Sequence, residues 1–186
     1  MLKDLVLANR SYRRFHEDAI GETTLRELVD LARLSASGGN AQALKYILSC
    51  DPEKNAAIFP HMAWAGYLAD WPGPAEGERP AAYIIILLDK EISESAGCDQ
   101  GVAAQSILLG ATERGLGGCM IGSIQRTELR KTLAIPERYG ILLAIALGKP
   151  KETVLVDKAM NGDIKYWRDD QDRHHVPKRL LDEIIL

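Results

Sequence analysis

The chain has 186 residues, of which 46% are hydrophobic, and its formal net charge is −3 at pH 7. This length and apolar content predict one domain with a sizeable core, and they exclude an intrinsically disordered chain. The negative charge argues against general nucleic-acid binding, because affinity for a phosphate backbone comes mainly from accumulated Lys and Arg.

Cysteine usage and the N-terminus indicate a reduced, intracellular protein. The cysteines Cys50, Cys98 and Cys119 have no metal-ligand spacing, and we expect them to be reduced core residues. The first residues lack the long apolar region and small-residue cleavage site of a signal peptide, so the expected location is the cytoplasm. No metal and no membrane partner is predicted.

The first predicted element is a helix over Leu2 to Ala8, which runs directly into the basic segment NRSYRRF at positions 9–15. Three arginines in five residues indicate an anion site, because guanidinium groups suit bidentate contact with phosphate or carboxylate. Ser11 can donate a further hydrogen bond to the same anion. A solvated basic helix end that complements the helix dipole is the alternative interpretation.

A second amphipathic helix is predicted to start at Thr23 or Thr24. Its inward face consists of apolar residues at helical spacing, namely Leu25, Leu28, Val29, Ala32 and Leu34. The helix ends in a turn of small and polar residues from Ser35 to Ala43, which leads into a strand from Tyr46 to Ser49.

The turn after this helix has features of a ligand-binding loop. Gly38 and Gly39 allow backbone amides to approach a ligand closely. Asn40 and Gln42 can each donate and accept hydrogen bonds. A plain helix-to-strand loop has the same residue types, so this pattern alone does not decide between the two.

Residues 51–88 are predicted to form a short helix, a long loop and a buried strand. Asp51 and Pro52 are typical of a helix start. The irregular stretch from Phe59 to Pro80 contains Trp64, Tyr67 and Trp71, which either cover a ligand or pack the loop onto the core. The apolar run from Ala81 to Leu88 is typical of a strand that is covered on both faces.

The stretch Asp99 to Gly122 predicts one buried helix and one buried strand, around which the rest of the chain is organised. Asp99 is expected to cap the helix and Gly115 to take the left-handed C-terminal position. No side chain from Gln100 to Thr112 is charged, and apolar or small residues occupy all faces, so the helix is expected to contact protein on every side. The neighbour is either the rest of this chain or a second subunit.

The remaining core elements are a strand at Cys119 to Ile121, a helix at Thr127 to Leu133 and a strand at Ile141 to Leu147. Helices thus alternate with four apolar strands, which predicts a sheet with helices on both faces. No linker or internal repeat divides the chain, so residues 1–186 are expected to form a single domain.

From Lys151 onward the chain is polar, and this extension is expected to wrap another subunit, because it has too few apolar residues for its own core. Pro177 suits the first turn of a terminal helix, which places Lys178 and Arg179 at its N-terminus. The helix dipole disfavours cations there, and a bound anion would reverse that effect. Two solvated side chains are the alternative.

Several familiar site motifs are absent from the sequence: the P-loop, the G-x-G-x-x-G fingerprint and H-E-x-x-H. Spacing does not exclude a nucleophile with a His base, but it singles out none. His174 and His175 are adjacent and face opposite ways in an extended chain, which makes them poor joint metal ligands. The two basic clusters therefore favour a phosphorylated cofactor, and no catalytic side chain is assigned.

The chain resembles the nitroreductase family of FMN-dependent oxidoreductases over nearly its full length. The resemblance rests on NRSYRRF at positions 9–15, SGGNAQ at 37–42, the helix and Gly-Leu-Gly turn within 99–122, and LGKP at 147–150. The chain departs from the family pattern at Asn9, where Arg is usual, at Ala36, where Pro is common, and at Ala43-Leu44, where Pro-Trp is common. These differences bear on flavin affinity and on the shape of the substrate pocket.

The resemblance implies a three-layer α+β fold with a mostly antiparallel sheet, and a homodimer that exchanges its C-terminal extensions. Two FMN sites would lie at the interface. One subunit would hold the phosphate and ribityl end through Arg10, Ser11 and Arg13, and Lys178 and Arg179 would add charge to the phosphate. The other would contribute the loop residues Ala36, Ser37, Gly38, Asn40 and Gln42. The isoalloxazine ring would run along Met120, Ile121, Gly122 and Ser123.

The implied activity is transfer of reducing equivalents from NAD(P)H, through non-covalent FMN, to a nitroaromatic, quinone or similar small acceptor by a ping-pong mechanism. The cofactor carries this chemistry, and the protein supplies orientation and electrostatics. Two alternatives stay open at this point. One is other flavin chemistry on the same fold, such as reductive dehalogenation or flavin consumption. The other is a flavin-binding dimer without turnover.

Overall fold

The structure, a computed structural model, describes all residues from 1 to 186 and is built around a five-stranded sheet. The strand order is β1-β5-β3-β2, with β4 also paired to β5, and every pair is antiparallel. The strands are β1 (Phe15–His16), β2 (Leu44–Ser49), β3 (Ala82–Asp89), β4 (Gly117–Ile121) and β5 (Tyr139–Pro150). The predicted antiparallel α+β architecture and its four apolar strands are thus confirmed.

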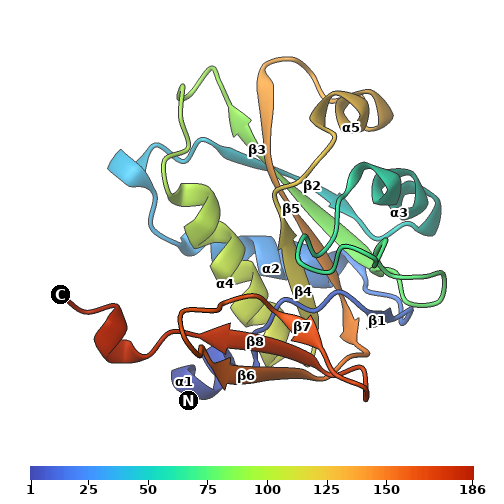
Figure 1. The fold of residues 1–186 in the computed structure, drawn as a ribbon. Helices are drawn as coiled ribbons and strands as arrows, with labels where there is room; N and C mark the ends of the chain where they lie inside the picture. Colours follow the sequence, from blue (N-terminus) through green and yellow to red (C-terminus); the bar gives the residue numbers. More distant parts are fainter.

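Helices cover both faces of this sheet (Figure 1). On one face, α2 (Glu22–Leu34) and α4 (Asp99–Glu113) pack against Ile84 and Ile86 of β3. On the other face, α3 (Pro52–Ile58) and α5 (Arg126–Thr132) pack against Ile85. All of β3 is buried, as its apolar sequence predicts, because successive side chains enter two different cores.

Helix α4 is mainly buried against its own chain. Gly110 faces Leu28 and Leu31 of α2, where a Cβ atom would clash, so the small residue permits the close approach of the two helices. The close neighbour that the sequence predicted is thus α2. The opposite side of α4 is less covered, since Val102 and Gln105 are exposed.

Two predictions about the start of α4 are wrong. Asp99 lies inside the first turn, and its side chain does not cap the helix but accepts hydrogen bonds from the loop at Ser37 and Gly38. Cys98 is the N-cap residue and is exposed, because it precedes the buried part of the helix, whereas Cys119 is buried. Gly115 has φ +71°, which confirms its left-handed position after the helix.

Helix α2 follows its predicted pattern except at its last residue. Leu25, Leu28 and Ala32 are buried, and Val29 packs against the same core. Leu34 was expected to face inward, but it is 66% exposed. It follows Leu25 by nine positions, which is two and a half helical turns and therefore the opposite face.

The extension forms a second sheet in the order β6-β8-β7, with β6 parallel to β8. Its strands are β6 (Val154–Lys158), β7 (Trp167–Arg168) and β8 (His174–Lys178), followed by a short 3-10 turn η3 (Leu181–Glu183). The predicted helix at Pro177 is wrong, because Pro177 pairs with Asp157 in the ladder. β7 begins opposite His175 and runs toward His174, so Pro177 lies beyond this pairing, where one edge of β8 is free and a missing N–H is tolerated.

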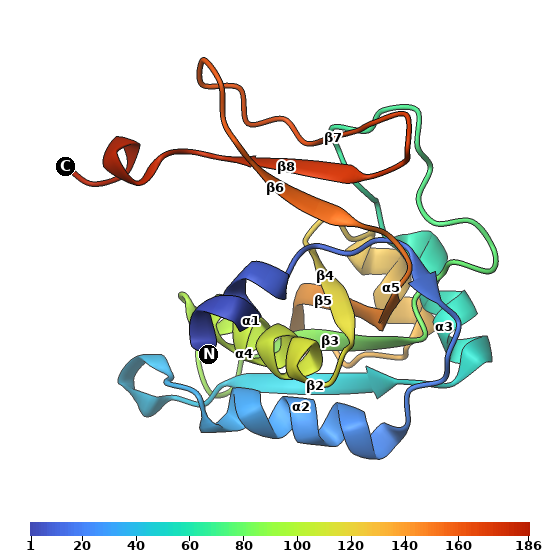
Figure 2. The same cartoon turned by 90° about the horizontal axis from the view of Figure 1, so that it is seen from below.

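The extension packs against the same chain, across the N-terminal segment from the central sheet (Figure 2). The Tyr166 ring packs against the Tyr67 ring in a tilted geometry with 4.9 Å between centroids, and the Arg168 guanidinium lies 4.5 Å from the Trp71 ring centre. Beyond β8 the C-terminal residues project away from the body. No helix is long and apolar enough to span a membrane.

Candidate FMN-binding site

The basic segment after α1 (Leu2–Ala8) and the extension enclose a cavity of about 270 Å³, which we call the basic cavity. Three cationic residues from distant parts of the chain meet in it: Arg10, Arg13 and Lys178. The other lining residues are Asn9, Ser11, Gln105, Leu108, Met120, Tyr166, His174 and Val176. The same cavity is lined by apolar side chains, namely Leu108, Met120 and Val176, and its cationic residues favour an anionic ligand.

The arginines of the basic cavity are only partly paired. Arg10 donates from Nη2 to the Val6 carbonyl at 2.7 Å, and its buried Nε has no partner. The Arg13 guanidinium lies over the Tyr166 ring, 4.8 Å from the ring centre, and no carboxylate pairs with it. Both side chains keep donor capacity for an anion, since each guanidinium carries five N–H groups.

His174 contacts Arg13 from the extension, with 3.1 Å between His174 Nε2 and Arg13 Nη1. Its pKa is lowered to about 4, first because the ring is buried and then because Arg13 and Arg168 are positively charged. The ring is therefore neutral near pH 7, and its Nε2 can accept a hydrogen bond from Arg13 without adding charge.

Glu152 fixes the backbone below the basic cavity. Its Oε1 accepts hydrogen bonds from the backbone amides of both Arg13 and Arg14, and its Oε2 accepts from Arg168 Nη2 at 3.0 Å. The Glu152 side chain is only 2% exposed. This carboxylate ties the start of the extension to the NRSYRRF segment and thereby sets the direction of Arg13.

Arg14, although adjacent to Arg13, is not free to hold a ligand. Its guanidinium pairs with Glu78 at 2.6 and 2.8 Å and with Asp172. The hydrogen bond from Arg14, aided by Lys151, lowers the pKa of Glu78 to about 2. Only the first two arginines of the segment therefore belong to the site.

A second cavity of about 170 Å³ adjoins the basic cavity and shares Arg13, Met120 and Tyr166 with it. We call it the strand-exit pocket, because the end of β4 forms one wall. The remaining lining residues are Ala63, Trp64, Ala65, Gly66, Cys119, Ile121, Gly122 and Ser123. The predicted residues Met120, Ile121 and Gly122 thus lie beside Arg13.

Strand geometry explains the exposure of Met120. Met120 is 37% exposed, whereas its neighbours Cys119 and Ile121 are buried, because alternate side chains of β4 point to opposite faces. Across the pocket, the buried Nε1 of Trp64 has no partner. Of the three loop aromatics, Trp64 lines the pocket, while Tyr67 and Trp71 pack the extension.

The loop predicted to bind a cofactor lines a separate cavity of about 140 Å³, which we call the loop pocket. Ala36, Ser37 and Gln42 line it, together with Asp99 at the start of α4. This pocket and the basic cavity share no lining residue. Within one chain, the two groups of predicted site residues are therefore not brought together.

Asp99 holds the loop pocket in shape. Its carboxylate accepts hydrogen bonds from Ser37 Oγ at 2.7 Å and from the Gly38 amide at 2.9 Å, and these bonds lower its pKa. Ser37 Oγ in turn accepts a hydrogen bond from the backbone amide of Gln42. Asn40 has φ +54°, and its backbone carbonyl accepts a hydrogen bond from Gln42 Nε2. The loop therefore turns sharply at Asn40.

Arg179 follows β8, is exposed and lines neither the basic cavity nor the strand-exit pocket. The two adjacent histidines do face opposite ways. His175 lies between Asp157 at 2.7 Å and Asp169 at 3.2 Å, and these hydrogen bonds raise its pKa. Both ring nitrogens of His175 are thus engaged outside the cavity.

The residues that join the extension to the N-terminal segment were not predicted from the sequence. Tyr166 and His174 line the basic cavity, and Glu152 lies beneath it. The only sequence feature that could have predicted a role for Tyr166 is that it is an aromatic residue in a polar segment. No sequence feature predicts a role for Glu152. Their partners lie more than a hundred residues away in the sequence.

Known proteins match this chain in sequence and in fold. The model of the nitroreductase family matches residues 6–149. An NADPH-flavin oxidoreductase of Vibrio harveyi is 22% identical over 166 residues, which is 80% of this chain and 65% of that protein. A putative NADH dehydrogenase/NAD(P)H nitroreductase of Archaeoglobus fulgidus is 25% identical over 156 residues, 80% of this chain and 84% of that protein.

Solved structures agree with the assignment of the fold. An FMN-dependent nitroreductase from Clostridium difficile superimposes with a TM-score of 0.66 at 24% identity, over 84% of this chain and 90% of that chain. A nitroreductase family protein from Streptococcus pneumoniae superimposes with a TM-score of 0.70 at 16% identity, over 100% of this chain and 99% of that one. The match of the family model over most of the chain shows that this protein belongs to the nitroreductase family.

Proposed function

We propose that this protein is an FMN-dependent NAD(P)H oxidoreductase whose flavin phosphate binds in the basic cavity. The observation that carries the proposal is the convergence of Arg10, Arg13 and Lys178 on one cavity that opens into the strand-exit pocket. Relatives of this chain are named as flavin or FMN reductases that use NADPH. We infer that residues 1–186 act as one FMN-binding domain, because both ends of the chain line this cavity.

The residues present fit FMN in charge and in shape. The buried Arg10 Nε without a partner supports an anionic ligand, because buried polar groups are normally hydrogen-bonded. Met120 and Gly122 line the strand-exit pocket and offer apolar and backbone atoms to a ring system. Two guanidinium groups and one ammonium group suit a phosphate, which accepts several charge-assisted hydrogen bonds.

The residues of the site divide into those that hold the phosphate and those that orient the ring. Arg10, Ser11, Arg13 and Lys178 bind the phosphate and the ribityl end, and Arg179 adds charge from outside the cavity. Met120 to Ser123, which line the strand-exit pocket, would orient the ring. Bound FMN supplies the transfer of electrons from NAD(P)H to a nitroaromatic, quinone or similar acceptor in a ping-pong sequence.

We infer that each site is completed by a second subunit. The loop pocket and the basic cavity are separate half-sites on one chain, and an isologous homodimer can bring the loop pocket of one chain to the basic cavity of its partner. In this arrangement Ser37, Gly38 and Asn40 contact the cofactor of the partner, Ala36 lines the same wall, and Gln42 supports the loop. Exchange of the C-terminal extensions would strengthen the dimer.

The exposed surface supports a dimer. The chain exposes 10592 Å², whereas a compact monomer of 20.5 kDa exposes about 8,900 Å². The excess includes large apolar side chains on α1, on α4 and on the C-terminal tail: Leu2, Val6, Leu7, Val102, Leu181, Ile184 and Ile185. Sedimentation of the purified protein at micromolar concentration should give a dimer, and a well-folded monomer would contradict the shared-site arrangement.

The cofactor is tested on purified, flavin-reconstituted protein. Denaturation should release a yellow, non-covalent chromophore that is identified as FMN. FAD, or no flavin after reconstitution, would contradict the proposal. Steady-state oxidation of NADH or NADPH with a panel of nitroaromatic and quinone acceptors then separates an oxidoreductase from a flavin-binding dimer without turnover. The cytoplasmic location stays a prediction from the sequence.

A further inference from the structure

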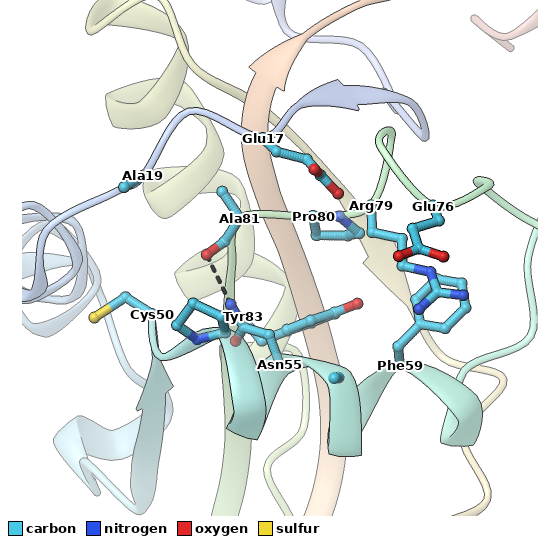
Figure 3. Close-up of a pocket in the computed structure, with 12 residues that line it drawn as sticks. Glu17, Ala19, Cys50, Asn55, Phe59, Glu76, Arg79, Pro80, Ala81 and Tyr83 are labelled. Carbon is cyan, nitrogen blue, oxygen red and sulfur yellow. Dashed lines mark hydrogen bonds between the residues drawn. The ribbon is translucent and has the colours of Figure 1, made fainter.

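A larger cavity, of about 350 Å³, lies beside α3 and shares no lining residue with the three cavities of the candidate site (Figure 3). We call it the side cavity. It is formed by the segment after β1, the end of β2, α3 and the loop before β3. Its lining residues are Glu17, Ala19, Cys50, Pro52, Asn55, Ala56, Phe59, Glu76, Arg79, Pro80, Ala81 and Tyr83.

The side cavity contains a buried hydroxyl group without a partner. Tyr83 is 1% exposed, and its hydroxyl oxygen has no hydrogen bond. Figure 3 shows its ring extending from β3 toward Phe59 and Arg79. Burial raises the pKa of this phenol, so the group is a hydrogen-bond donor at neutral pH. A buried polar group of this kind normally has a hydrogen-bond partner within the protein. Because the Tyr83 hydroxyl has none, we take the space beside it as the place of a hydrogen-bond acceptor on a ligand.

The neighbouring polar side chain, by contrast, is fully engaged. Asn55 Nδ2 donates to the Ala81 carbonyl at 2.8 Å, and its Oδ1 accepts from Ser49 Oγ at 2.7 Å. Asn55 therefore differs from Tyr83, because its amide group already has partners within the protein.

Arg79 places an unpaired positive charge in the same cavity. Its guanidinium carbon lies over the Phe59 ring, 4.3 Å from the ring centre, and its Nε is buried without a partner. The adjacent Glu78 does not neutralise it, because Glu78 pairs with Arg14 and Lys151. The Arg79 guanidinium is held in place by its contact with the Phe59 ring, and its N–H groups remain free to donate hydrogen bonds.

We propose that the side cavity binds a small monocarboxylate with an apolar, preferably aromatic, body. The carboxylate accepts paired hydrogen bonds from Arg79 and one from the Tyr83 hydroxyl, which matches the fork geometry of a guanidinium. The apolar body packs on Cys50, Ala56 and Phe59. Glu17 and Glu76 also line the cavity and are exposed, and their repulsion grows with the negative charge of the ligand, so a single carboxylate is favoured over a doubly charged phosphate.

The test is calorimetric titration of the flavin-loaded protein with benzoate, with benzylamine as the cationic counterpart. Saturable binding of benzoate is expected, with no comparable binding of benzylamine. Arg79→Gln should weaken benzoate binding by about 10-fold to 100-fold, because a charge-assisted hydrogen bond is lost. Tyr83→Phe should weaken it by about 2-fold to 10-fold, the effect of one neutral hydrogen bond.

Arg26→Gln is the matched control, because Arg26 is an exposed arginine on α2 that contacts only Glu22. Its affinity for benzoate should equal that of the parent. Tyr83→Phe should also fold normally without ligand, since it removes a buried hydroxyl that has no partner, and unchanged FMN content shows that each variant is intact. Absence of saturable benzoate binding to the folded parent, equal affinity in Arg79→Gln, or preference for benzylamine would each overturn the proposal.

Discussion

The central sheet and the sheet of the extension are both β structure, but different interactions hold them in place. All eight residues of β3 are buried between two apolar clusters that include residues of four helices. In the three strands of the extension, only His174 is buried, and the extension contacts the body through ion pairs and aromatic contacts. Apolar burial stabilises the body, whereas a few polar contacts position the extension over the basic cavity.

The largest expected effect is a change in the body. Ile86→Ala in β3 should lower the free energy of unfolding by about 2–5 kcal/mol, because it leaves a cavity in a fully buried cluster. Val156→Ala in β6, where the side chain is 44% exposed, should change it by less than about 1 kcal/mol. Chemical denaturation measures the free energy of unfolding of both variants. Equal decreases in the two variants would contradict the contrast between the two sheets.

This contrast also explains how much of the fold could be predicted. The run from Ala81 to Leu88 predicted β3 because burial on both faces requires apolar residues at every position. The extension was predicted as a polar segment with a terminal helix at Pro177, and its strands were missed. Their pairing depends on contacts such as Val156 with Val176, which leave no periodic apolar pattern in the sequence.

The candidate site likewise combines residues that the sequence predicts with residues that it does not. Arg10, Ser11 and Arg13 form a local motif, so the sequence predicted their shared role and the structure brings them to one cavity. His174 reaches Arg13 over a separation of 161 residues, and no local pattern could predict this contact. The loop from Ser37 to Gln42 was predicted as a site element, and its anchor Asp99 was taken for a helix cap.

A second prediction concerns the carboxylate that joins the two regions. Glu152→Gln should lower the free energy of unfolding by about 1–3 kcal/mol, because the charge partner of Arg168 is lost in a buried environment. FMN binding should weaken as well, since Arg13 loses the anchor of its backbone amide. The exposed Glu94→Gln is the control and should leave both quantities within experimental error. Unchanged stability of Glu152→Gln would show that this buried pair does not hold the extension.

A smaller effect is expected in the pH dependence of stability. The pKa of His174 is about 4 in the folded protein, below its ordinary value of 6.5. Between these values the unfolded chain binds a proton that the folded chain does not, so stability should fall as the pH is lowered from 6.5 to 4. Below pH 4 this group contributes no further change.

His174→Gln removes this proton linkage and should flatten the decrease in stability between pH 6.5 and pH 4. His16→Gln, an exposed residue of β1, should leave the profile of the parent unchanged. Denaturant midpoints measured across this pH range provide the check. A profile for His174→Gln that matches the parent would show that His174 is protonated as readily in the folded state as in the unfolded one.

The most direct test of the central claim, that the basic cavity holds the phosphate of FMN, is to compare the affinities for FMN and riboflavin. Arg10→Ala and Arg13→Ala should each weaken FMN binding by about one to two decades, because a charge-assisted hydrogen bond is lost. Riboflavin has no phosphate and should bind the two variants and the parent about equally. Arg26→Ala, on the exposed face of α2, should bind FMN like the parent. If the Arg10 and Arg13 variants bind FMN as tightly as the Arg26 control, the phosphate is held elsewhere and the proposed site is wrong.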